Sequence, residues 1–101
     1  MIDPLKITVQ YRTKLGKVYE LSNRDSVLAV HISPPEEGEH ASTWHVEARF
    51  GTGAGPAIAD GRGATAAEAL SETGRTWAQR APVPTFDWEA VTRELRGVHA
   101  V

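Results

Sequence analysis

Thr43-Trp44-His45-Val46-Glu47-Ala48-Arg49-Phe50, together with the segment from Thr65 to Arg80, decides the fold of this 101-residue chain. In the first stretch apolar and polar residues alternate, which is the period of a half-buried strand. In the second segment the residues expected to be buried recur at three- and four-residue spacing, as on one face of a helix. They are Ala66, Ala69, Leu70, Thr73 and Trp77. The change of period predicts a strand followed by an amphipathic helix.

The ends of this helix carry their own signals. Thr65 with Glu68 three residues later is the pattern of a capping box, in which each side chain satisfies a free backbone N–H. We expect the helix to stop near Arg80, because Pro82 and Pro84 follow and proline cannot continue a helix.

A second, shorter helix is predicted after Asp87, which is suited to cap its first turn. Phe86 precedes that cap and is expected to pack on Val91 as a hydrophobic staple. Trp88, Val91 and Leu95 recur at helical spacing and form its apolar stripe.

The part of the chain before Thr43 reads as extended segments joined by short turns. Alternation from Ile7 to Arg12, a turn at Gly16 and a second extended run beginning at Val18 predict a hairpin. The run from Val27 to Ile32 predicts a third strand, and Ala57 to Asp60 a short, weak final one. The fold class is therefore α+β: an antiparallel three- to four-stranded β-meander followed by two helices packed on one face.

Length and composition indicate a single domain over residues 1–101, with 41% hydrophobic and 24% charged residues. Residues 33–42 are expected to form an acidic, proline-rich loop, and residues 81–86 a proline-rich linker between the helices. The absence of cysteine excludes disulfides and thiolate chemistry, and it favours a cytoplasmic location. No segment has the length and apolar character of a membrane span or a secretory signal, so no membrane association is expected.

Charge is unevenly distributed along a chain whose formal net charge is −2. Residues 1–24 are mainly basic, whereas residues 25–47 contain acidic residues and neither lysine nor arginine. Cations clustered at a hairpin are plausible phosphate contacts, and so is one at the glycine-rich entry to a helix. The candidate phosphate or nucleic-acid contacts are Arg12, Lys14, Lys17 and Arg62.

Residues suited to catalysis or metal binding do not form a recognisable motif. His31, His45 and Glu47, with Glu39 and His40 nearby in sequence, offer a mixed imidazole and carboxylate set, but without the tight spacing typical of metal ligands. No nucleophile elbow occurs either. We therefore expect no enzyme activity, no catalytic residues, no metal and no cofactor.

The outward face of the central strand provides the candidate interaction residues His45, Glu47 and Arg49. The sequence predicts a stable fold but contains no catalytic motif. This combination favours a non-enzymatic interaction domain that binds a protein partner, or itself as a homo-oligomer, through a sheet face or edge. The alternative is a nucleic-acid-binding protein that uses the basic N-terminal hairpin and the helix entry at Arg62.

Overall fold

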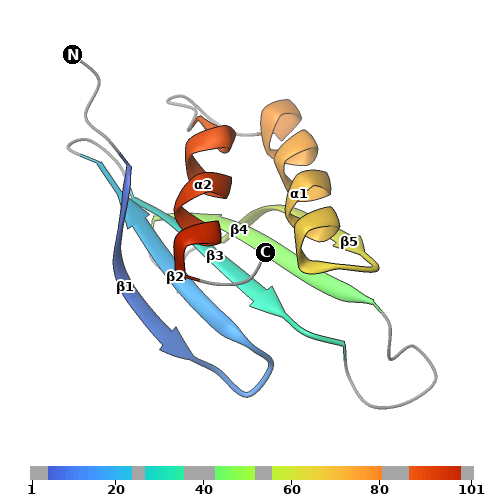
Figure 1. Cartoon of the computed structure of the whole chain (residues 1–101). Coiled ribbons are helices and arrows are strands. Elements are labelled where there is room, and N and C mark those ends of the chain that lie inside the picture. The colour runs from blue at the N-terminus through green and yellow to red at the C-terminus, as the bar shows by residue number, and fades with distance from the viewer. Residues whose placement is uncertain (1–4, 24–26, 36–42, 52–55, 81–86, 99–101) are drawn as a thin grey trace.

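The computed structural model describes residues 5–23, 27–35, 43–51, 56–80 and 87–98, which form one antiparallel sheet and two helices (Figure 1). The strands follow their sequence order across the sheet, β1-β2-β3-β4-β5. Their bounds are β1 Lys6–Arg12, β2 Lys17–Ser22, β3 Val27–Ser33, β4 Trp44–Phe50 and β5 Ala57–Gly63, followed by α1 Ala66–Arg80 and α2 Trp88–Val98. The α+β meander is as expected, but the sheet has five strands rather than three to four.

The strand predicted as short and weak over Ala57 to Asp60 is the fifth strand, β5, and it is longer than predicted. The alternation of small residues ends at Asp60 in the sequence, but the strand continues through Gly61, Arg62 and Gly63, where a turn into the helix was expected. These two glycines permit close approach to α1: a Cβ at Gly61 would lie 2.5 Å from the backbone nitrogen of Thr73. A glycine-rich segment therefore serves here as a strand that a helix covers closely.

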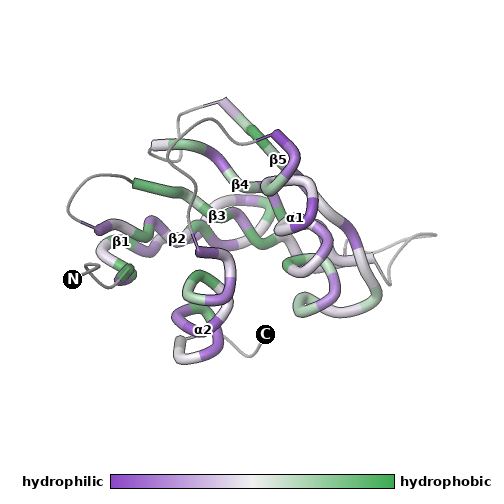
Figure 2. The backbone as a smooth tube through the Cα atoms, turned by 90° about the horizontal axis from the view of Figure 1, so that it is seen from above, coloured by the Kyte–Doolittle hydropathy of each residue, from purple (hydrophilic) through white to green (hydrophobic). Residues whose placement is uncertain are grey.

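Both helices lie on the same face of the sheet (Figures 1 and 2). Helix α1 packs on β4 and β5, whereas α2 lies toward β1. The helix-side residues of the sheet meet the apolar stripes of both helices in one core. Its buried members are Leu5, Tyr19, Leu21, Leu28, Val30, Ile32, Val46, Ala48, Ala59, Ala66, Ala69, Leu70, Trp77, Val91 and Leu95.

The predicted helix caps are present. The backbone N–H of Glu68 donates to Thr65 Oγ1 at 3.1 Å, and the Glu68 carboxylate accepts from the N–H of Ala64 at 2.9 Å. In α2, the N–H of Glu89 donates to Asp87 Oδ1 at 3.1 Å. Polar side chains therefore fix the first turn of each helix.

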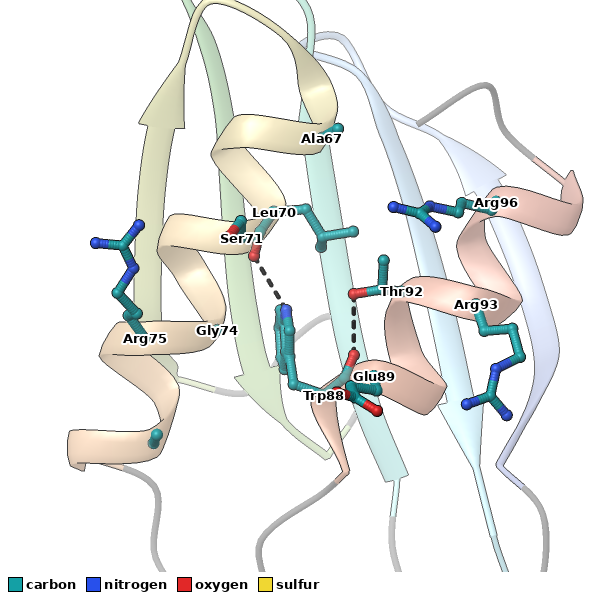
Figure 3. Close-up of a pocket in the computed structure, with 11 residues that line it drawn as sticks. Ala67, Leu70, Ser71, Gly74, Arg75, Trp88, Glu89, Thr92, Arg93 and Arg96 are labelled. Atoms are coloured by element: carbon teal, nitrogen blue, oxygen red, sulfur yellow. Dashed lines mark hydrogen bonds between the residues drawn. The ribbon is translucent and has the colours of Figure 1, made fainter.

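Trp88 joins the two helices. Its indole Nε1 donates to the carbonyl of Leu70 at 3.0 Å (Figure 3). Its ring lies tilted against Trp77, with centroids 6.1 Å apart. Gly74 makes room for it, because a Cβ there would collide with the Trp88 ring. The staple expected from Phe86, the linker 81–86 and most of the acidic loop (36–42) lie outside the described residues.

A β-bulge in β1 changes which side chains face the core. The pairing with β2 shifts between Ile7 and Val9, so that Ile7 lies opposite Leu21 and Val9 lies opposite Glu20. One inserted residue reverses the inward and outward positions after it. Simple alternation placed Ile7, Val9 and Tyr11 on one face, but only Ile7 packs against the core.

Candidate functional site

The sheet face opposite the helices, here called the open face, collects most of the side chains that could bind a partner. Residues directly opposite one another in an antiparallel pair point to the same side, so the register defines this face. One row crosses all five strands: Tyr11, Val18, His31, Glu47 and Asp60. Flanking rows add Val9, Glu20, Ala29 and Arg49 on one side, and Ser33, His45 and Arg62 on the other.

A connected set of charged side chains occupies the β4–β5 end of the open face. Arg49 Nη2 donates to Glu47 Oε2 at 2.8 Å, and His45 Nε2 lies 3.1 Å from Asp60 Oδ2. His45 Nδ1 is 4.0 Å from Glu47 Oε1. The structure therefore brings together His45, Glu47 and Arg49, the three residues selected from the sequence. It adds Asp60, the last residue of the strand predicted over Ala57 to Asp60, which alternation along that strand could have identified.

His31 lies at the centre of the row, directly opposite Glu47. Burial lowers its pKa; the nearby Glu47 carboxylate opposes this effect, whereas Arg49 and His45 add to it. His31 Nε2 lies 3.0 Å from Thr13 Oγ1, at the turn between β1 and β2. This histidine therefore connects the open face to the hairpin.

The β1–β2 end of the open face carries large apolar side chains, together with Glu20. Val9 and Tyr11 are 45% and 43% exposed, because the bulge turns them away from the core. Val18 is only 5% exposed although both described helices lie on the other face. Val18 lies between Tyr11 and His31 in the row across the strands. The face thus combines an exposed apolar end with a charged end.

The described part of the chain contains no group of three or more histidine, aspartate or glutamate side chains arranged to hold a metal ion. His45 contacts Asp60 and approaches Glu47, but His31 contacts Thr13 instead of joining them. Glu39 and His40, the other members of the set drawn from the sequence, lie outside the described residues.

The four candidate phosphate contacts do not share one surface. Arg12, Lys14 and Lys17 surround the β1–β2 turn, whereas Arg62 lies on β5 at the opposite edge of the sheet. Four strand spacings of about 4.8 Å separate the two edges, roughly 19 Å in all. Arg62 also pairs with His45 on the open face, so strand alternation directs it away from α1. The first turn of α1 already holds the carboxylate of Glu68.

A groove and a smaller recess on the helix side of the sheet are lined by cationic side chains. The groove between α1 and α2, of about 630 Å³, is lined by arginines at positions 75, 93 and 96. They do not converge: Arg96 reaches toward α1, whereas Arg75 points to the far side of α1 and Arg93 away from the groove (Figure 3). The smaller recess, of about 280 Å³, lies beside the β1–β2 turn and is here called the hairpin pocket. Its walls include all three hairpin cations.

Neither of the two described helices has the length and apolar character needed to cross a membrane. Comparison with family models, with curated proteins and with solved structures finds no match for this chain.

Proposed function

We propose that this protein is a non-enzymatic interaction domain that binds a protein partner, or a second copy of itself, through the open face. The observation that carries the proposal is the composition of that face: Val9 and Tyr11 are about half exposed at its β1 end, and an ordered set of charged side chains lies at its β4–β5 end. Exposed apolar residues flanked by polar ones are typical of protein interfaces.

The charged end supplies specificity in this proposal. Arg49 and Glu47 are held 2.8 Å apart, and each side chain is less than one-third exposed. Charges already fixed in position lose little conformational freedom on binding, and they penalise partners of unsuitable charge. The apolar end supplies the area removed from water.

The experiment combines sedimentation velocity over a wide concentration range with photo-cross-linking from two positions. A cross-linking residue replaces Tyr11 on the open face or Ala78, an exposed residue of α1 that lines the groove between the two helices. We expect one defined product, a dimer or one partner, from position 11 and not from position 78. Val9→Asp should abolish the product, whereas Leu15→Asp, at a 58% exposed residue of the turn, should not.

A protein that stays monomeric at every concentration and gives the same cross-links from both positions contradicts the proposal. A product that survives Val9→Asp would place the interface elsewhere.

Nucleic-acid binding is the second candidate function, and one observation favours it. Arg12, Lys14 and Lys17 line the hairpin pocket together, and the described residues that line it include no carboxylate. Arg62 has no part in this candidate, because it lies at the other edge of the sheet. A gel-shift series at low salt tests it, since phosphate contacts are strongest there; no retained DNA or RNA would refute it.

A further inference from the structure

The hairpin pocket has a cationic side and an apolar side. Arg12 and Lys17 lie directly opposite each other in the β1–β2 pair, and Lys14 lies in the turn between them. The apolar lining consists of Leu15, Ile32, Pro34 and Trp44. An anion attached to an apolar body would meet complementary surfaces on both sides.

The cationic side places like charges next to each other. Like charges placed directly opposite each other in a sheet repel, and Arg12 and Lys17 form such a pair. Between described residues, the ion pairs involve neither of these side chains nor Lys14. A bound anion would relieve this repulsion, and arginine and lysine are the usual ligands for phosphate groups.

The turn that positions these cations is ordered by its own hydrogen bonds. Thr13 Oγ1 accepts from the backbone N–H groups of Leu15 at 3.2 Å and Gly16 at 3.1 Å. The N–H of Thr13 donates to the carbonyl of Gly16 at 2.8 Å. Gly16 lies so close to the end of β3 that a Cβ would collide with the carbonyl of Ile32. The pocket wall is thus formed before a ligand arrives, which lowers the entropic cost of binding.

We propose that the hairpin pocket binds a nucleotide, with its phosphate between Arg12, Lys14 and Lys17 and its base against Leu15 and Trp44. The volume of about 280 Å³ is at the lower end of small-molecule sites, so it suits one nucleotide rather than a peptide helix. Phosphate alone would leave the apolar side unused. The nucleotide can be free or part of a single strand, whose bases commonly stack on aromatic side chains. This proposal rests on the second candidate function, nucleic-acid binding, and specifies its ligand. It does not depend on the proposed binding of a protein partner through the open face.

The experiment is a low-salt NMR titration of the ¹⁵N-labelled full chain with four separate probes: AMP, adenosine, inorganic phosphate and a short oligo(dA). We expect AMP and oligo(dA) to shift the amide signals of Thr13 to Lys17 and the indole N–H of Trp44. Adenosine and phosphate should bind at least about tenfold more weakly, because each uses one side of the pocket only; a tenfold change corresponds to about 1.4 kcal/mol.

Single-residue variants test the cationic side and the apolar side of the hairpin pocket separately. Lys14→Ala should weaken AMP binding several-fold and lower the salt dependence of oligo(dA) binding by about 0.7 in the logarithmic slope, the amount for one phosphate contact on a single strand. Leu15→Ala should weaken AMP but leave phosphate unchanged. Lys6→Ala, which removes an exposed β1 lysine that is not among the pocket residues, is the matched control and should change neither. All these side chains are outside the core, so the variants should fold.

The outcomes separate the pocket from the nucleic-acid candidate. AMP bound in the pocket without oligo(dA) supports the nucleotide site and refutes nucleic-acid binding. Oligo(dA) bound with shifts elsewhere, and unaffected by Lys14→Ala, overturns the pocket proposal and leaves the nucleic-acid candidate standing. Phosphate bound as tightly as AMP overturns the role of the apolar side. No binding of AMP or oligo(dA) at low salt overturns both.

Discussion

Thr13 and His31 are joined by a hydrogen bond whose direction the surrounding contacts determine. Thr13 Oγ1 lies 3.0 Å from His31 Nε2 and accepts from the N–H groups of Leu15 and Gly16. A hydroxyl has two acceptor lone pairs and one hydrogen, so the hydroxyl donates to the histidine. The contact to the Gly16 carbonyl, at 3.4 Å, is longer. This arrangement favours the neutral form of His31 with its proton on Nδ1.

The first prediction follows from this neutral state. Burial lowers the pKa of His31 in the folded protein, so the unfolded chain binds the proton more readily. Stability is then retained above the unfolded pKa of about 6.5 and lost as pH falls from there toward the lower folded pKa. Urea unfolding across this range should show a falling free energy of unfolding, and NMR should find the His31 proton on Nδ1.

His31→Gln provides the control, because the amide oxygen can still accept from Thr13 and has no proton to gain. The difference in stability between the wild type and this variant should be constant above about pH 6.5 and change below it. Contributions common to both proteins cancel in this comparison. A difference that stays constant through the whole range contradicts the prediction.

The second prediction concerns the close approach of α1 to β5. Gly61→Ala places a methyl group 2.5 Å from the backbone nitrogen of Thr73 and 2.7 Å from the carbonyl oxygen of Ala69. Because both are backbone atoms, the helix has to move, and we expect a loss of about 1–3 kcal/mol or more. Thermal and urea unfolding measure it. Gly97→Ala is the matched control: its Cβ meets nothing within 4 Å, so it should be neutral or stabilise by up to about 1 kcal/mol.

The third prediction concerns the contact between Gly74 and Trp88, and a double-mutant cycle tests it. Gly74→Ala alone should destabilise, because the new methyl group meets the indole ring that joins α2 to α1. In the background of Trp88→Ala the obstacle is absent, and the same substitution should stabilise by up to about 1 kcal/mol through helix propensity. Equal effects in both backgrounds would show that Trp88 is not the reason for glycine at this position.

The fourth prediction concerns Thr73, the buried polar residue of α1. Its Oγ1 lies 2.7 Å from the Ala69 carbonyl and 3.2 Å from the carbonyl of Val46 in β4. Thr73→Val removes the donor at nearly constant shape, and we expect a loss of about 1–2 kcal/mol in urea unfolding. Thr76→Val, which removes a bond to the Glu72 carbonyl within the same helix, should cost less because water can replace that bond. Similar losses at both positions would contradict the role given to burial.

Much of the candidate site was visible in the sequence because strand alternation is local. His45, Glu47 and Arg49 were selected by their positions in β4, and the structure connects two of them directly. Asp60 and Thr13 were missed, because the first depends on how β5 pairs with β4 and the second on how the turn meets β3. The sequence analysis also grouped Arg62 with the hairpin cations. The structure separates them, because the meander places β5 and β1 at opposite edges of the sheet.

The sequence by itself determined the elements that short-range physics controls. The alternation in β4, the capping pair Thr65 and Glu68, and the apolar stripe of α1 each depend on residues within one turn or strand. Tertiary structure decided the rest: the bulge that turns Val9 outward, the length of β5, and the placement of Trp44 in the same pocket as the hairpin cations. These depend on pairing and packing between segments far apart in the chain, where register and close backbone approach override local pattern.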